Sequence, residues 1–379
     1  MKLDYQNRIF GLDIMRATAI LFVVCSHVLW VFPELENSFT EILRFFGVMG
    51  VEIFFVLSGF LIGRILFRIY TSNDFGFNHF FYFLIRRWFR TFPNYYLVLL
   101  INILIVLFIG RSLPESLGYY FFFLQNTVNG MDIFFTESWS LPIEEFAYII
   151  GQILFYLVFS LNSKMNRKRS FMIITLGIIT FFLLSKVYYN INTDSNSMEI
   201  WNIDLKAVVL YRIDAIYYGV LAAYLSQVKP GFWNKNKGYL FFIGMIAFFG
   251  MHVFITAYGY TIQNVPFFWN VLYLPLCSLC IACSLPFFSN LNNAPGFILK
   301  PFTFISVISY SMYLLHYSII LQLLNFIMPS GALSLIQKLL FSTGYMVSTI
   351  FLSYLLYRWY EKPMMDIIDL PFIRKKLSN

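Results

Sequence analysis

Residues 14–32 read IMRATAILFVVCSHVLWVF, and this stretch decides the class of fold. An α-helix needs about 20 apolar residues to cross the hydrocarbon core of a bilayer, and these residues come close to that length. Arg16 and His27 are the only strongly polar side chains in the stretch. The next residues, Pro33-Glu34-Leu35-Glu36, lack the small residues of a signal-peptide cleavage site, so we predict a transmembrane helix.

Nine further apolar stretches follow the first one. They lie near residues 46–66, 94–110, 139–161, 170–187, 206–226, 239–258, 267–289, 302–326 and 335–357. Hydrophobic residues make up 59% of the chain and charged residues 12%, whereas about a quarter of the residues of a soluble protein are charged. We therefore predict an all-α, polytopic membrane protein of about ten transmembrane helices, with residues 1–379 forming one membrane-embedded domain.

The net charge of +8 does not indicate a nucleic-acid partner, because the basic residues fall in short clusters between apolar runs. Clusters such as 86–90 and 164–169 occupy alternate connecting segments, which the positive-inside rule places in the cytoplasm. Both termini are then predicted to be cytoplasmic. Cysteines 25, 277, 280 and 283 lie inside apolar stretches, so we predict neither a disulfide framework nor a metal site.

Titratable residues inside a membrane span are costly and are therefore candidate functional residues. Arg16 and His27 are 11 residues apart, which places them on one face of a helix. His27 can serve as a general base, and Asp13 is spaced to pair with Arg16. The alternative is a packing histidine and an arginine that only anchors the helix at the bilayer surface.

The segment ESWSLPIEEF (137–146) opens the span at 139–161. Counted from the outer helix ends, Glu144 and His27 each lie roughly 8–9 Å deep, so we expect them to meet at one level. A carboxylate beside a histidine stabilises the imidazolium that forms during base catalysis. Glu145 is expected to face lipid headgroups, Trp139 to join the interfacial aromatic belt or contact the acceptor, and Pro142 to kink the start of the helix.

Arginines at the inner membrane surface are candidates for binding phosphate groups. In IRRWFRTFPNYY (85–96), Arg87 and Arg90 are neighbours on one helical turn, and paired guanidinium groups match phosphate oxygens in forked geometry. Ordinary positive-inside anchoring is the alternative for this cluster.

Four further polar residues lie inside predicted spans. Arg212 and Asp214 form either a buried structural pair or part of a polar cavity, and His316 supports packing or contacts a substrate. Ser58 is either a packing residue or a site hydroxyl, and the neighbouring Gly59 and Gly63 predict a close helix contact.

Several segments in this order resemble the acyltransferase 3 family of bacterial membrane O-acyltransferases, which modify surface polysaccharides. The resemblance covers nearly the whole chain. It is carried by GLDIMRATAILFVVCSH (11–27), GVEIFFVLSGFLIGRIL (50–66), RRWFRTFPNYY (86–96), ESWSLPIEEF (137–146), RIDAIYYGVLAAY (212–224), SYSMYLLHYSI (309–319) and YEKP (360–363). The arginine-histidine pair of the family's first helix then corresponds to Arg16 and His27, its RxxR signature to Arg87 and Arg90, and its acidic position to Glu144.

The resemblance implies a ten-span enzyme of the bacterial cytoplasmic membrane. The implied donor is acyl-CoA, most often acetyl-CoA, and no tightly bound cofactor is expected. The implied acceptor is a hydroxyl of a surface carbohydrate, such as lipopolysaccharide, or of a lipid-linked saccharide. We expect Arg16, Arg87 and Arg90 to bind the donor phosphates and His27, oriented by Glu144, to deprotonate the acceptor. Direct transfer and an acylated protein intermediate both stay open, and the rival class is a transporter or flippase in which the same charges form an ion pathway.

Overall fold

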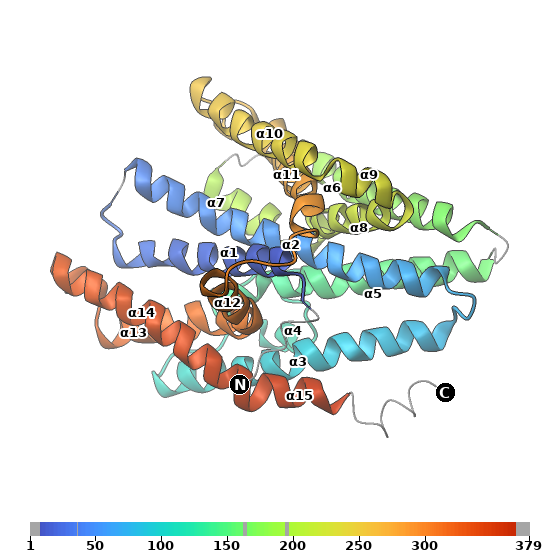
Figure 1. The fold of residues 1–379 in the computed structure, drawn as a ribbon. Helices are drawn as coiled ribbons and strands as arrows, with labels where there is room; N and C mark the ends of the chain where they lie inside the picture. The colour runs from blue at the N-terminus through green and yellow to red at the C-terminus, as the bar shows by residue number, and fades with distance from the viewer. Residues whose placement is uncertain (1–7, 36, 162–164, 194–196, 369–379) are drawn as a thin grey trace.

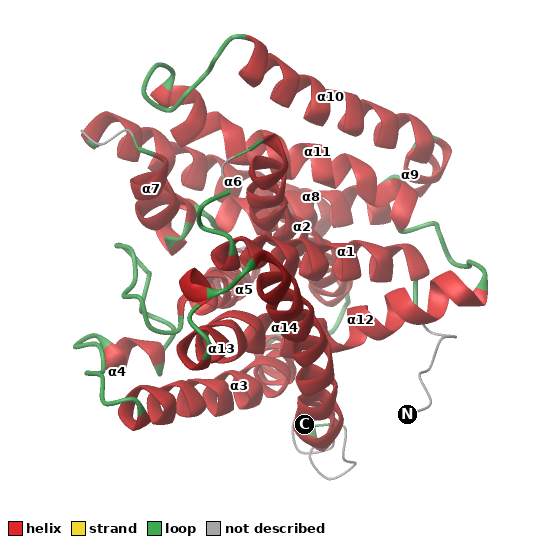
Figure 2. Ribbon diagram, turned by 90° about the vertical axis from the view of Figure 1, so that its left-hand side faces the viewer, coloured by secondary structure: helices red, strands yellow, loops and turns green. Residues whose placement is uncertain are grey.

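The computed structural model describes residues 8–35, 37–161, 165–193 and 197–368, and these residues form helices joined by loops (Figures 1 and 2). Nine described helical runs are long and apolar enough to cross a membrane. They are α1 with η1 (Phe10–His27, Val28–Val31), α2 (Ser38–Thr71), α3 (Phe77–Phe108), η2 with α5 (Thr136–Trp139, Ser140–Leu161), α6 (Arg167–Asn192), α10 (Lys237–Ala257), η5 with α11 (Phe268–Leu272, Tyr273–Phe288), α12 with η6 and α13 (Gly296–Leu315, His316–Leu321, Gln322–Ile327), and α14 with η8 and α15 (Leu335–Leu356, Tyr357–Glu361, Lys362–Ile367). The predicted all-α membrane fold is thus confirmed, whereas both chain ends and Lys164 lie outside the described residues.

The stretch expected at 206–226 forms a shorter helix, α8 (Ile213–Val228), which is mostly buried in the bundle. Three short elements precede it: α7 (Met198–Ile200), the π-helix η3 (Trp201–Lys206) and the 3-10 turn η4 (Val209–Tyr211). The amides of Val209 and Leu210 donate to the carbonyls of Asn126 and Thr127. Backbone bonds to another segment thus replace the missing turns of helix, as a chain inside a membrane protein requires.

Helix α3 begins at Phe77, well before the expected start at residue 94. Arg87 and Arg90 therefore lie within a helix and not in a connecting segment. Pro93 is accommodated inside α3. Pro142, which was expected to kink its helix, lies in the first turn of α5, where a backbone N–H has no intrahelical acceptor to lose.

Helices α1, α2 and α8 form the centre of the bundle, between α10 with α11 on one side and α3 with α14 on the other (Figures 1 and 2). A Cβ atom on Gly59 would clash with the Ile216 carbonyl oxygen, and one on Gly63 would lie 2.9 Å from the Val220 Cα atom. The close contact predicted from Gly59 and Gly63 is confirmed, and it joins α2 to α8.

The segment between α3 and α5, which contains α4 (Leu117–Tyr120), folds back against α3. The Tyr95 hydroxyl donates to the Tyr120 carbonyl at 2.8 Å, and the Tyr96 hydroxyl donates to the Phe121 carbonyl at 2.7 Å. Phe123 is buried with a φ of +59°, and its ring stacks on Tyr95 at a centroid distance of 4.3 Å. These contacts hold the start of α5 inside the bundle, not at its surface.

Helix α10 shows where the lipid lies. Its window of highest hydropathy is only 6% buried within the protein, although its mean hydropathy is 2.1. Phe242, Ile246, Phe249 and Val253 are all exposed. An apolar, exposed helix of this length is stable only against lipid, which agrees with a multi-pass membrane protein.

Four fully buried charges connect the central helices. Glu52 of α2 pairs with Arg212, and Lys186 of α6 pairs with Asp214 of α8. Ser278 of α11 donates to Glu52 at 3.0 Å. Sequence analysis left Arg212 and Asp214 open as a mutual pair or cavity residues, but each pairs with a different helix. This arrangement supports the structural interpretation.

Replacing Gly59 with alanine should destabilise the bundle by about 1–3 kcal/mol, because the new methyl group overlaps the Ile216 carbonyl. Thermal unfolding in detergent measures the change. Gly250→Ala on α10 is the matched control, since a Cβ there meets no atom within 4 Å. Equal melting temperatures for the two variants would contradict the close contact.

Asp214→Asn should cost about 3–5 kcal/mol of stability, because it leaves the Lys186 charge buried without its counter-ion. Glu41→Gln provides the control, because it breaks the exposed Arg44–Glu41 pair and should change stability by no more than about 0.5 kcal/mol. Denaturant unfolding measures the stability of both variants. A loss for Asp214→Asn as small as that for Glu41→Gln would argue against a structural ion network.

Candidate active site

A cavity of about 850 Å³ opens at the end of the bundle where α1 begins and α2 ends, which we call the basic end. Its lining contains seven arginines and three carboxylates. The arginines are Arg8, Arg16, Arg64, Arg68, Arg86, Arg87 and Arg90. We call it the arginine cavity. Such an excess of positive charge beside apolar walls attracts anions, and guanidinium groups suit phosphate oxygens.

Arg87 is held in place by contacts to helix α5. Its Nη2 atom lies 3.8 Å from Glu144 Oε2 and donates to the Tyr148 hydroxyl at 3.3 Å. Its guanidinium group also lies over the Tyr148 ring, 4.8 Å from the centroid. These contacts fix the direction in which Arg87 faces the cavity.

Glu144 and Ser58 belong to the same cluster. The Tyr148 hydroxyl donates to Glu144 Oε2 at 2.7 Å, and the Ser58 hydroxyl lies 3.2 Å from the same oxygen. Ser58 and Glu144 both line the arginine cavity. Ser58 is therefore a cavity hydroxyl, and the predicted acidic residue lies among the predicted donor-binding arginines.

Arg16 and Arg90 line the cavity without an ion pair to any described residue. The Arg16 guanidinium group lies close enough to Arg90, Arg8 and Arg87 to be repelled by their charges. Like charges in a low-dielectric cavity repel, and a bound anion removes that repulsion. The cavity thus brings together Arg16, Arg87 and Arg90, as the sequence predicted.

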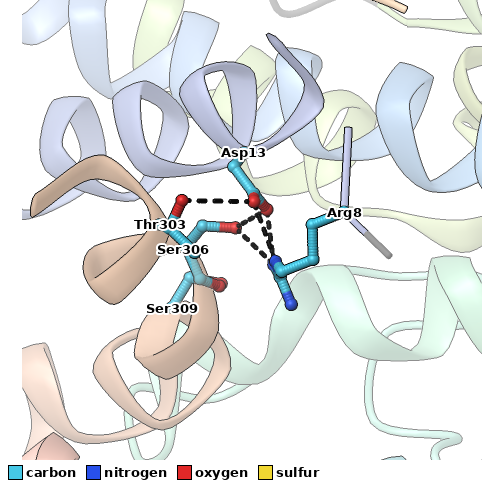
Figure 3. A network of polar contacts seen from close by, with 5 residues as sticks. All are labelled: Arg8, Asp13, Thr303, Ser306 and Ser309. Atoms are coloured by element: carbon cyan, nitrogen blue, oxygen red, sulfur yellow. Dashed lines mark hydrogen bonds and ion pairs between the residues drawn. The ribbon is translucent and has the colours of Figure 1, made fainter. Parts of the chain in front are cut away.

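Asp13 pairs with Arg8 at the cavity mouth, and not with Arg16 as the spacing predicted (Figure 3). Arg8 Nε donates to Asp13 Oδ2 at 2.8 Å, and the Ser306 hydroxyl of α12 donates to Asp13 Oδ1 at 2.7 Å. Thr303 lies on the same side of α12. This network ties the chain before α1 to α12, so Asp13 has a structural role and Arg16 keeps its charge for the cavity.

The deep end of the cavity is lined by Val51, Phe54, Ser140 and Tyr313. The Ser140 hydroxyl donates to the Tyr313 hydroxyl at 2.7 Å. From Arg68 at the mouth to Val51 the cavity follows 17 residues of α2, which is roughly 25 Å at about 1.5 Å per residue. The cavity therefore suits a long, narrow molecule with an anionic head.

His27 lies beyond this deep end, against His316. The two ring centroids are 4.8 Å apart and the rings are nearly perpendicular, at 68°. The Tyr313 ring, which lines the cavity, lies 5.8 Å from His316. One layer of side chains thus separates the arginine cavity from the histidine pair.

The expected contact between His27 and Glu144 is not formed. A Cβ on Gly47 of α2 would touch Ser26, which places Gly47 level with the end of α1, whereas Ser58 lies 11 residues further along α2. Glu144, bonded to Ser58, therefore sits roughly 16 Å nearer the basic end than His27 does. The expectation failed because α5 begins inside the bundle, so counting residues from an outer membrane surface gave the wrong depth.

Two neighbouring predictions are also corrected. Glu145 is buried close to Arg87 and does not face headgroups. Trp139 lies inside the bundle, with the Lys206 amine 5.4 Å from its ring and Phe55 packed edge-on against it. Neither residue lies at the membrane surface, because the folded-back segment before α5 carries both inward.

Sequence reasoning missed Glu137, Tyr148 and Tyr313. Glu137 is buried, and its Oε1 atom accepts from both the amide and the hydroxyl of Ser318. The signal for Glu137 was its place directly before the SWSL segment, but buried tyrosines in so aromatic a chain carry no comparable signal. The described residues bring together no group of three His, Cys, Asp or Glu side chains spaced to hold a metal ion.

Comparison with known proteins gives a family match and two named relatives. Residues 9–358 match the model of a family described as an acyltransferase domain. The chain is 27% identical over 331 residues to OatA of Listeria monocytogenes, which is named as a peptidoglycan O-acetyltransferase. The aligned region covers 82% of this chain and 49% of OatA. It is also 27% identical over 338 residues to YrhL of Bacillus subtilis, whose name gives the same activity as a provisional assignment, covering 84% of this chain and 50% of YrhL.

The chain spans about half the length of the curated relatives it matches. No solved structure matches it.

If the arginine cavity binds the donor expected from the sequence, Arg90→Ala should weaken the binding of free coenzyme A roughly 10- to 100-fold, because it would remove a charge-assisted contact worth about 1.5–3 kcal/mol. Isothermal titration with purified protein at fixed salt measures the affinity. Arg111→Ala is the matched control, since Arg111 carries the same charge in the loop after α3 and is not part of the cavity lining. Equal losses in both variants would mean that only net charge matters.

Proposed function

This chain belongs to the acyltransferase 3 family, and we propose that it transfers an acetyl group from coenzyme A to a hydroxyl of a cell-surface carbohydrate. The observation that supports this most is the arginine cavity. It opens at the basic end, is lined by Arg16, Arg87 and Arg90, and ends one residue layer from a pair of histidines.

The shape and charge of the cavity favour coenzyme A as the donor. Its phosphates would contact Arg16, Arg87 and Arg90, in the forked geometry that guanidinium groups offer. The remaining length of the cavity, toward Val51 and Tyr313, would take the thin thioester arm. An acyl group delivered there stops beside the wall that Tyr313 and Ser140 form, close to His316 and His27.

In the proposed reaction His27 acts as the general base. Its imidazole takes the proton of the acceptor hydroxyl while the hydroxyl oxygen attacks the thioester carbonyl carbon. The carbon–sulfur bond then breaks, the acyl group stays on the acceptor oxygen, and the thiolate leaves and takes up a proton. Tyr313 must move for donor and acceptor to meet, which makes its hydrogen bond to Ser140 a candidate closure between the two compartments.

Glu144 has a different role from the one its sequence motif suggested. It holds Arg87 toward the cavity and lowers the net charge there, so it acts through donor binding. Ser58, bonded to Glu144, is placed to contact the middle of the donor.

The acceptor is the least constrained part of the proposal. The relatives named above suggest peptidoglycan as the first acceptor to test, and other surface saccharides follow. With coenzyme A on the cytoplasmic side and a surface carbohydrate on the other, the bacterial cytoplasmic membrane is the location that fits. A transporter is less well supported, because the described lining of the cavity ends at the Tyr313 wall and does not include His27.

His27→Ala should reduce acetyl transfer at least about 100-fold while coenzyme A binding stays unchanged, because the base is lost and the arginine cavity is intact. The assay uses purified full-length protein in lipid nanodiscs, labelled acetyl-CoA and peptidoglycan fragments. His252→Ala on α10 is the matched control, because His252 is also a histidine of a membrane-spanning helix and does not line the cavity.

A full rate for His27→Ala would refute the assignment of the base. Saccharide that crosses proteoliposomes without being acylated would favour the transporter.

A further inference from the structure

The histidine pair is built asymmetrically. His27, at the end of α1, is partly exposed, whereas His316, at the start of η6, is completely buried behind it. Their ring centroids are 4.8 Å apart. One imidazole can therefore meet an acceptor, and the other can meet only its neighbour.

Backbone contacts fix the tautomer of both rings. His27 Nδ1 lies 2.8 Å from the Val23 carbonyl oxygen, and His316 Nδ1 lies 2.8 Å from the Tyr313 carbonyl oxygen. A carbonyl oxygen only accepts, so Nδ1 of each neutral ring must carry the hydrogen. The lone pair of each ring is therefore on Nε2.

The lone pair of His316 accepts no hydrogen bond from the described residues. His316 Nε2 is buried and has no hydrogen-bond partner among the described residues. A buried polar atom without a partner costs about 1–3 kcal/mol and calls for a physical explanation. The ring cannot escape this cost by rotating, because rotation would break its bond to the Tyr313 carbonyl.

The backbone around His316 is held by a dedicated contact. His316 opens the π-helix η6, a form that occurs mostly as single turns at functional sites. Within that turn the Ser318 amide and hydroxyl donate to Glu137 Oε1, at 3.0 and 2.6 Å. A buried carboxylate is thus used to lock the turn that aims His316 at His27.

We propose that His316 is a positioning residue that stabilises the imidazolium of His27, the role that the sequence assigned to Glu144. This proposal rests on the proposed function. His27 Nε2 takes the proton from the acceptor hydroxyl. The lone pair on His316, whose ring centroid lies 4.8 Å from that of His27, then stabilises the imidazolium charge until the leaving thiolate takes the proton. No additional reactant is required.

Three variants of the full-length protein test this. His316→Leu removes the lone pair, so kcat should fall about 100-fold while the affinity for coenzyme A stays within about twofold. His316→Gln retains an oxygen that accepts a hydrogen bond, and it should recover kcat to within about tenfold of the wild type. His252→Leu is the matched control, because the Nδ1 atom of His252 also contacts a backbone carbonyl, that of Phe248.

Solid-state nitrogen NMR of histidine-labelled protein provides a readout that packing alone would not move. At neutral pH the wild type should show His27 and His316 as neutral rings protonated at Nδ1. The pH at which the His27 ring takes up a second proton should differ between the wild type and His316→Leu. Rings protonated at Nε2 would overturn the proposal even if a variant fails to fold.

The kinetic outcomes separate this proposal from the proposed function. An active wild type with an equally active His316→Leu variant would overturn the role of His316 and leave the acyltransferase assignment intact. Equal loss of kcat in the leucine and glutamine variants would indicate that His316 acts only through packing. That result would also overturn the proposed role of His316. A wild type that binds coenzyme A but transfers no acetyl group to any acceptor tried would contradict the proposed function itself.

Discussion

The cost of placing a charge in an apolar interior is the constraint on which this structure depends. The charges buried among the central helices form ion pairs, Glu52 with Arg212 and Lys186 with Asp214. Charges that line the arginine cavity are treated differently. Arg16 and Arg90 form no ion pair with a described residue, although the buried carboxylate of Glu361 lies within electrostatic range of both. The positive charges that line the cavity therefore outnumber the carboxylates near them, and a bound anion would lower their mutual repulsion.

The same constraint divides the site into two compartments. The arginines proposed to bind the donor lie along the basic half of the cavity, and the histidine pair lies beyond the wall formed by Tyr313 and Ser140. A membrane enzyme that joins a soluble, highly charged donor to an acceptor on the opposite side benefits from such a division. It keeps the two aqueous spaces apart while leaving a short path for the acyl group.

Periodicity and hydropathy were sufficient to predict nine of the ten expected spans and the close packing at Gly59 and Gly63, because both follow from local sequence. The grouping of Arg16, Arg87 and Arg90 was also predictable, since all three lie toward the same membrane surface. The depth of Glu144 was not, because it depends on the segment before α5 folding into the bundle. Asp13 illustrates a related limit: Arg16 and Arg8 were both within reach, and the hydroxyl of Ser306, distant in sequence, favours the arrangement with Arg8.

The central claim is that coenzyme A enters from the basic end with its thioester beside the histidine pair. An experimental structure of the protein with a non-hydrolysable acetyl-CoA analogue tests it most directly. We predict phosphate density against Arg16, Arg87 and Arg90, and the acetyl carbon at the wall between Tyr313 and His316. An analogue bound outside the arginine cavity, or one whose acetyl group points away from Tyr313, would contradict the account.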